Sequence, residues 1–278
     1  PGAGDQLRGD QLMLGLNSGL LGVRRVPTTT SASGLWFPNE QSLAKRGGIW
    51  PGNLADPYFN NVSLLLHMNG SNGSTTFIDS SSNALTVTAN GNAQISTAQS
   101  KFGGASALFD GNGDYLQTST STNLSLGNSD FTIELWARRG QSAPANANFL
   151  QMSAGADLYS MLFGYTVSSE LQVYISSNNS SWDIANGKLL GIPLVDTWVF
   201  YAITRSGSNF YTFQDGTQQS TWTSSASIYQ ASNQVTIGKS QNTASEDYKG
   251  YIDDLRITKG VARYTANFTP PTAPFPNS

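Results

Sequence analysis

Carboxylates are the side chains of this sequence that could most readily catalyse a reaction, since hydrolysis of a glycosidic bond normally uses two of them across a cleft. Asp253 and Asp254 are neighbours in a predicted strand, so their side chains point to opposite faces and cannot share one site. The only histidine, His67, lies in an apolar segment typical of a packed strand. We therefore assign no catalytic residue and expect a protein that is not an enzyme.

Oxygen-bearing side chains also suit calcium, which takes carboxylate and amide oxygens as ligands. Asp110, Asn112 and Asp114 place such oxygens at alternate positions of a glycine-rich turn. The remainder of an EF-hand loop is missing, because Tyr115 and Ser121 stand where glycine and the bidentate glutamate belong. The alternative is a hairpin turn whose Asp side chains accept hydrogen bonds from their own backbone.

Asp253 is the fourth candidate calcium ligand. Alternation along residues 248–258 places it on the same face as Leu255 and Ile257, so we expect it to point into the core. A buried carboxylate is costly unless it is paired or bound to a metal. Its donors must come from a neighbouring turn, an arginine or a structural Ca²⁺ ion, and no other cofactor is required.

Aromatic side chains among polar neighbours could stack on a sugar ring while nearby amides bond its hydroxyl groups. Four residues fit this description: Trp136, Tyr174, Trp182 and Trp222. Trp136 alternates outward from the apolar residues of its predicted strand, residues 131–137. For each of the four, the alternative is a place in the core or in an interface.

Composition excludes several classes of partner. The net charge is −3, the pI is about 5.1 and basic residues occur only as isolated pairs, so we expect no nucleic-acid binding. The apolar run 12–21 is short and broken by Gly15 and Asn17, so it cannot cross a membrane. No cysteine and no signal segment are present, which favours assembly in a cytoplasm.

Residues 1–60 differ from the remainder of the sequence. Glycine-rich apolar pieces and aromatic–proline clusters follow one another without a helical or strand period. We expect an extended, mostly irregular arm that cannot form its own core and that docks on another surface through large apolar side chains. The side chains proposed for this role are Trp36, Phe37, Trp50, Tyr58 and Phe59. The alternative is a collar wrapped on the chain's own domain.

Residues 61–278 alternate between short apolar strands and turns rich in Gly, Asn and Asp, with almost no helical period. Residues 131–137 and 171–175 alternate cleanly, and 209–214 end at Asp215-Gly216, a strong hairpin signal. Many short strands at this spacing predict an all-β fold, an antiparallel β-sandwich.

Five motifs in this second region resemble, in the same order, those of laminin-G-like, concanavalin-A-like jelly rolls. They occupy residues 106–116, 131–136, 210–216, 235–238 and 248–264. The resemblance implies a jelly-roll sandwich. The catalytic E-x-D-x-x-E strand of the hydrolases with this fold is missing, because Trp136 and Arg139 stand where the aspartate and the second glutamate would follow Glu134.

The particular residues in these motifs are similar to those of versions found in tailed-phage structural proteins. It implies a non-enzymatic virion protein, either a capsid decoration or a tail or fibre component, whose lectin-like sandwich adheres to host-surface or environmental glycans. Residues 1–60 would then bind other virion proteins or copies of the chain. The alternative is a stand-alone carbohydrate-binding or adhesion module, and neither hypothesis involves nucleic acid or a membrane.

Overall fold

A computed structural model describes strands at residues 12–14 and 20–23, and then residues 55–143, 146–153, 160–167, 169–230, 232–240 and 246–278. The chain forms two compact units, Pro1–Ala55 and Asp56–Ser278. In the first unit, β1 (Leu12–Leu14) and β2 (Leu20–Val23) pair antiparallel. Trp36, Phe37 and Trp50 lie outside the described residues, so their role as anchors stays a prediction.

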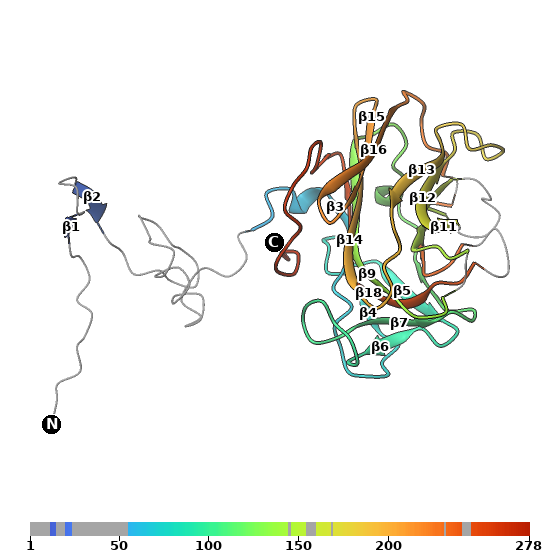
Figure 1. The fold of residues 1–278 in the computed structure, drawn as a ribbon, viewed down its shortest axis with the longest axis horizontal. Coiled ribbons are helices and arrows are strands. Elements are labelled where there is room, and N and C mark those ends of the chain that lie inside the picture. Colours follow the sequence, from blue (N-terminus) through green and yellow to red (C-terminus); the bar gives the residue numbers. More distant parts are fainter. Residues whose placement is uncertain are drawn as a thin grey trace. The chain divides into compact units, whose positions relative to one another are not determined.

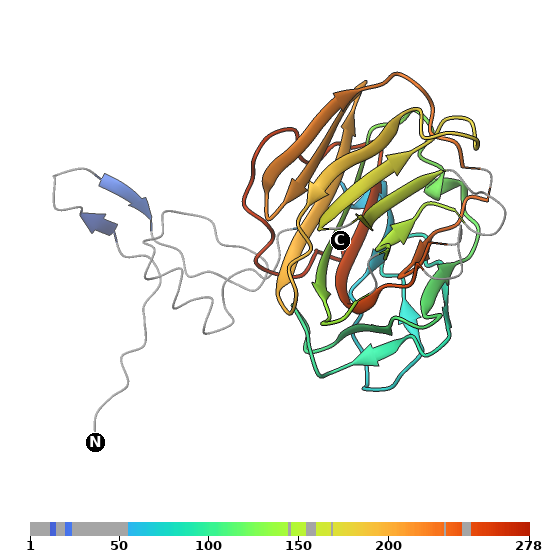
Figure 2. The ribbon, with the colours of Figure 1, turned by 45° about the vertical axis from the view of Figure 1, so that its right-hand side comes forward.

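The second unit consists of two antiparallel sheets packed face to face (Figures 1 and 2). We call them sheet A and sheet B. Sheet A has the order β13 (Ala185–Gly191), β12 (Glu170–Ile175), β11 (Met161–Val167), β10 (Leu150–Gln151), β17 (Thr236–Ile237), β8 (Tyr115–Thr118), β5 (Thr86–Asn90), β4 (Phe77–Ile78). Sheet B has the order β16 (Thr217–Thr223), β15 (Asn209–Gln214), β14 (Trp198–Ser206), β9 (Phe131–Arg139), β18 (Lys249–Lys259), β7 (Ser106–Asp110), β6 (Gln94–Ser96), with β3 (Val62–Leu66) beside β18. The predicted antiparallel sandwich is confirmed.

Alternation builds the core between the sheets. In β12, Leu171, Val173 and Ile175 are fully buried, while Gln172 and Tyr174 between them stay partly exposed on the outer face of sheet A. The same pattern across both sheets produces one large apolar cluster that joins them. Fully burying such a side chain contributes roughly 1.5–3 kcal/mol, so this cluster is the main source of stability.

One glycine changes the direction of a neighbouring side chain in β11. Gly164 has a φ of +80°, and a Cβ on it would lie 2.0 Å from the Phe149 ring. The pairing with β12 shifts between Phe163 and Tyr165 at this point, as in a β-bulge. Phe163 is therefore buried in the core, whereas Tyr165 is partly exposed beside Tyr174.

The outer face of sheet B is buried by the chain itself. A second apolar cluster forms there, with members on β3, β9, β14 and β15 and on the C-terminal segment 261–278. Phe275 is a buried member, and Phe59, Tyr264 and Phe268 pack against the cluster. Phe59 thus lies on the sandwich unit, as does Tyr58, whose 45% exposed ring faces the Arg263 guanidinium at 5.5 Å.

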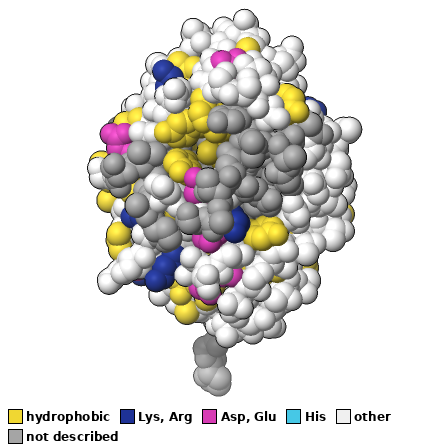
Figure 3. Space-filling view, turned by 90° about the vertical axis from the view of Figure 1, so that its right-hand side faces the viewer, with side chains coloured by type: hydrophobic (Ala, Val, Ile, Leu, Met, Phe, Trp, Pro, Cys, Tyr) yellow, Lys and Arg dark blue, Asp and Glu magenta, His cyan; other side chains and the backbone are white. Residues whose placement is uncertain are grey.

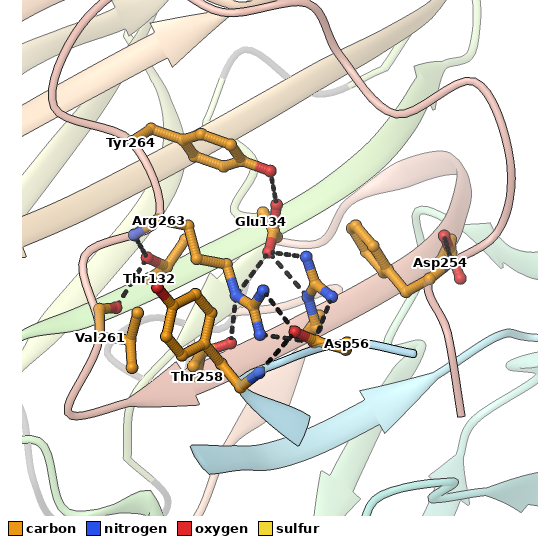
Figure 4. A network of polar contacts seen from close by, with 11 residues as sticks. Asp56, Thr132, Glu134, Asp254, Thr258, Val261, Arg263 and Tyr264 are labelled. Atoms are coloured by element: carbon orange, nitrogen blue, oxygen red, sulfur yellow. Dashed lines mark hydrogen bonds and ion pairs between the residues drawn. The ribbon is translucent and has the colours of Figure 1, made fainter. Parts of the chain in front are cut away.

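A buried ion network fastens this cover to the sheet (Figure 4). Arg256 bridges Glu134 at 2.8 Å and Asp56 at 2.9 Å, and Arg263 binds Asp56 at 2.6 Å. The Tyr264 hydroxyl donates to the second oxygen of Glu134 at 2.7 Å. Burial alone would raise the pKa of Asp56, but the Arg263 hydrogen bonds and charge hold it below its ordinary value. The network ties residue 56 to the C-terminal segment through two strands of sheet B.

Candidate functional site

Three aromatic rings gather on the outer face of sheet A, near the edge formed by β12 and β13. Tyr165 of β11 and Tyr174 of β12 meet edge to face, with ring centroids 5.7 Å apart. Trp182, from the loop before β13, lies 5.5 Å from Tyr174. All three are partly exposed. Two of the four aromatic residues suggested by the sequence, Tyr174 and Trp182, are therefore brought together, and Tyr165 joins them.

Polar side chains hold the two tyrosine rings in place. The Tyr165 hydroxyl donates to Glu246 Oε1 at 2.8 Å, and the Tyr174 hydroxyl donates to Gln172 Oε1 at 2.6 Å. Gln172 in turn donates to Glu170 at 2.9 Å. Burial is the main cause that raises the pKa of both tyrosines, and Glu246 adds to it at Tyr165, so both hydroxyls remain protonated donors at neutral pH. The rings are thus oriented in advance of any ligand.

A glycine allows the polar end of the Tyr174 ring to lie close to the backbone of β13. Gly187 of β13 has a φ of +65°, and a Cβ on it would come within 3.0 Å of Gln172 Oε1 and 3.3 Å of the Tyr174 hydroxyl. A larger residue would therefore crowd the polar end of the ring. Figure 3 looks onto the side where β11, β12 and β13 lie, and it shows hydrophobic side chains next to acidic and basic ones.

Two carboxylates lie beside the three rings. Glu246 is 8% exposed: its Oε1 accepts from Tyr165, and its Oε2 is buried without a hydrogen-bond partner among the described residues. Glu170 supplies a second carboxylate at the edge of the group. A surface with flat apolar rings bordered by such acceptors suits a ligand that combines C–H faces with hydroxyl donors.

The other two aromatic candidates are structural. Trp136 is 5% exposed and belongs to the second cluster, with Phe102 and Phe200 edge-on to it at 6.0 and 5.3 Å. Lys101 Nζ lies 3.7 Å from the centre of its ring. Trp222 stacks on Phe210 at 5.1 Å at the margin of the main core. The prediction that Trp136 offers its face to a sugar is wrong, because the chain covers the outer face of sheet B.

The glycine-rich turn is held by its own backbone. The Asp114 carboxylate accepts from the amides of Asp110, at 2.8 Å, and Asn92, while Asp110 accepts from the Asn112 amide at 2.8 Å. Gly113 N donates to Asp247 at 3.0 Å. Burial is the largest cause that raises the pKa of Asp114, and the nearby Asp110 charge adds to it. The carboxylates of Asp110 and Asp114 thus accept from backbone N–H donors, as the hairpin-turn alternative expects, and a bound calcium stays an untested prediction.

Asp253 lies elsewhere. Asp110 is paired with Lys249 in β18, so Asp253 is four residues further along, about 13 Å away. Its Oδ2 accepts from the amides of Lys101 at 2.7 Å and Phe102 at 3.0 Å, so a neighbouring turn provides its donors. Its Oδ1 has no hydrogen-bond partner among the residues that the structure describes. Burial is the main cause that raises the pKa of Asp253 to about 7.

The predicted orientation of Asp253 is wrong. Its neighbour Asp254 has a φ of +47°, and the pairing of β18 with β9 shifts between Asp253 and Arg256. This bulge reverses the alternation, so Asp253 is paired with Trp136 on the outer face, while Leu255 belongs to the main core. Asp253 is nevertheless fully buried, beneath the turn 101–102.

The remaining reactive side chains are bound in structural contacts. Glu134 is held in the ion network, and His67 Nδ1 lies 2.6 Å from Asp254 Oδ1 while its Nε2 meets Asn277. Across the described parts of the chain, no three His, Cys, Asp or Glu side chains gather closely enough to hold a metal ion. Helices within the same residues are short 3-10 turns, and none has the length or hydropathy of a membrane span.

Sequence reasoning missed Tyr165, Glu246 and Asp56. A tyrosine in a strand carries no signal of its own, and Tyr165 is turned outward only by the bulge at Gly164. Glu246 lies 81 residues from Tyr165 in the sequence, and only the fold brings them together. Glu134, Arg256 and Arg263 lie in the recognised motifs, with two arginines for one carboxylate. This imbalance is a signal that a second acidic partner, such as Asp56 before β3, is needed.

The fold is shared with binding domains of known structure. The binding domain of Paraclostridial Mosquitocidal Protein 1 matches with a TM-score of 0.56 at 11% identity, over 73% of this chain and 49% of that chain. The botulinum neurotoxin serotype D binding domain matches with a TM-score of 0.55 at 12% identity, again over 73% and 49%. This chain thus spans about half the length of each toxin domain.

A third similar structure is domain 4 of AbnA, a GH43 extracellular arabinanase from Geobacillus stearothermophilus, in complex with arabinotriose. Its TM-score is 0.53 at 17% identity, over 73% of this chain and 94% of that domain. A search of curated protein sequences found no match. The model of the family Laminin_G_3, described as the concanavalin A-like lectin/glucanases superfamily, matches residues 110–263, more than half of the chain. The protein therefore belongs to this laminin-G-like family of the concanavalin A-like lectins and glucanases.

Proposed function

We propose that Asp56–Ser278 is a non-enzymatic module that binds a glycan on the outer face of sheet A. The observation that carries this proposal is the group of three partly exposed rings, Tyr165, Tyr174 and Trp182, bordered by oriented acceptors. Stacking on the rings would remove the C–H faces of a sugar from water. Hydroxyl groups would donate to the exposed carboxylate of Glu170.

The similar structures and the charges around the rings support this proposal. One similar structure is a domain of an arabinan-degrading enzyme solved with arabinotriose, and others are toxin binding domains. The two carboxylates that border the rings each meet a neutral side chain, Glu246 the Tyr165 hydroxyl and Glu170 the Gln172 amide. The surface therefore favours neutral sugars over acidic ones, since like charges repel.

A glycan array followed by titration tests the proposal. We expect the full chain to bind at least one neutral oligosaccharide, and Trp182→Ala or Tyr174→Ala to raise its Kd at least tenfold, about 1.4 kcal/mol. Tyr58→Ala is the matched control, because Tyr58 is an exposed aromatic that lies on the sandwich outside this group. Failure to bind any neutral glycan, or equal affinity in all variants, would count against the proposal.

We propose further that the N-terminal arm, expected over residues 1–60 and shortened to Pro1–Ala55 because Asp56 and Phe59 belong to the sandwich, anchors the sandwich to a phage virion. Two observations favour this role: the arm lies before the region matched by the family, and Pro1–Ala55 is a compact unit separate from the sandwich. An antibody against the sandwich that labels purified phage particles would support the virion location. Recovery of the protein only as a free species after lysis would favour the stand-alone binding module instead.

A further inference from the structure

The four outermost strands of the two sheets differ in how their free edges are protected. An unprotected edge offers unpaired N–H and C=O groups to any extended strand, so proteins normally shorten, charge, bend or cover it. In sheet B, β6 is covered, because Ile95 N and O are both bonded by residues 73–74, at 2.8 Å each. In sheet A, β4 has only two residues. Neither β6 nor β4 therefore offers a free edge on which a further strand could pair.

β13, the other edge of sheet A, is irregular. Its pairing with β12 shifts twice, and Gly187 and Gly191 have φ values of +65° and +154°. Lys188 places a charge on it, and the Leu189 carbonyl accepts from Thr212 Oγ1 at 2.6 Å. A bent, charged and partly bonded strand is a poor template for a further strand.

β16 has fewer of these protections, although a bulge at Gln219 interrupts its pairing with β15. It has seven residues, Thr217–Thr223, without a charged residue or proline, and it lies at the outer margin of sheet B (Figures 1 and 2). Only its beginning is capped among the described residues: Gln218 N donates to Asn267 at 2.8 Å and Thr217 O accepts from Gln219 Nε2 at 3.0 Å. Residues 220–223 pair with β15, and their outer edge meets no further hydrogen bond from the described residues.

We propose that this open stretch pairs antiparallel with the same stretch of a second copy of the chain. The strand reads Thr-Gln-Gln-Ser-Thr-Trp-Thr, and its amides and hydroxyls both donate and accept, so it is complementary to itself. Without charges, two copies bring no like charges together. A two-fold axis at Thr221 pairs residue 220 with residue 222 and leaves the Asn267 cap intact in both copies.

The consequence is one continuous sheet made of both copies of sheet B. It leaves the aromatic group on sheet A free in each copy, because β16 and the group belong to different sheets. The dimer would then present two copies of that surface. Its formation does not depend on whether the surface binds a glycan.

Cross-linking of the full chain tests the register. The sequence has no cysteine, so a single cysteine can react only with its counterpart. Directly opposed residues in antiparallel strands have Cα atoms about 4.5–5.5 Å apart, within the range of a disulfide. Under mild oxidation, Thr221→Cys should form a covalent dimer. Thr88→Cys, an exposed threonine in β5 of the other sheet, should remain monomeric.

Sedimentation equilibrium gives the second readout. We expect the unmodified chain to dimerise and Thr221→Lys to raise the dimer Kd at least tenfold, because two ammonium groups would face each other. Thr88→Lys is the control and should leave the Kd unchanged. The proposal is overturned by a chain that stays monomeric, by an oligomer that Thr221→Lys does not weaken, or by failure of Thr221→Cys to cross-link. An oligomer held by residues 1–60 would give the second of these results.

Discussion

The outer faces of the two sheets both carry aromatic side chains that lie among polar residues in the sequence. These side chains are buried on one sheet and partly exposed on the other. On sheet B, Trp136 and Phe200 are covered by the C-terminal segment and the turn 101–102, and they become a second core. On sheet A, Tyr174 and Trp182 remain partly exposed; a hydrogen bond to Gln172 orients Tyr174, and Trp182 packs against the Tyr174 ring. An outward aromatic residue is therefore a candidate for binding only where the chain does not cover it.

This comparison also separates two uses of buried charge. Under the cover of sheet B, Glu134 and Asp56 are paired with arginines. On sheet A, Glu246 is nearly buried but keeps one oxygen unbonded beside Tyr165. The first arrangement holds segments of the chain together, whereas the second fixes the position of the Tyr165 ring through its hydroxyl.

The largest expected effect follows from removing the network under sheet B. Glu134→Ala leaves the guanidinium of Arg256 buried with one fewer carboxylate, and breaking a buried pair costs about 3–5 kcal/mol. Urea denaturation should show this loss of unfolding free energy. Arg138→Ala, which breaks the exposed pair with Asp196, should cost no more than about 1 kcal/mol. Equal losses in the two variants would contradict the role given to the network.

Trp136→Ala and Trp182→Ala test the difference between the buried outer face of sheet B and the partly exposed outer face of sheet A. Loss of a buried indole leaves a cavity, so Trp136→Ala should lower the unfolding free energy by about 3 kcal/mol, as measured by denaturation. Trp182→Ala should cost clearly less, because its ring is partly exposed. If Trp182→Ala were the more destabilising variant, the ring would belong to the core and not to a binding surface.

Much of the sandwich can be predicted from the sequence, since clean alternation in residues 131–137 and 171–175 reports the face of each residue. The cover of sheet B cannot, because residues 261–278 have no period and their target is set by packing. Bulges defeat alternation as well: one at Gly164 turned Tyr165 outward, and one at Asp254 moved Asp253 away from Leu255. For the candidate site, Tyr174 and Trp182 were predictable and their partners were not.

A smaller effect is expected at Asp253. Its pKa in the folded protein, about 7, lies above the ordinary value, so the folded state binds a proton more tightly and stability should rise as the pH falls from about 7 toward 4. Asp253→Asn removes the buried charge and should raise the unfolding free energy by about 1–3 kcal/mol at pH 8, with little change at pH 5. Thermal melts at both pH values measure this, and a loss at pH 8 would contradict it.

The smallest effect concerns the C-terminal segment. Burial lowers the pKa of His67, but its contacts with Asp254 and Asn277 raise it more, so the net pKa lies above the ordinary value. Its contribution to stability is therefore full below about pH 6.5 and is lost as the pH rises through the folded pKa. His67→Gln should cost about 0.5–1 kcal/mol at pH 5.5 and less at pH 8.5, as measured by denaturation. The same cost at both pH values would exclude a titrating pair.

Titration of the full chain with a neutral oligosaccharide chosen from an array tests the central claim most directly. The unmodified protein and Tyr58→Ala should bind with equal affinity, while Tyr174→Ala and Trp182→Ala, both folded, should bind at least tenfold more weakly. Unchanged affinity in the last two variants would contradict a binding surface on sheet A.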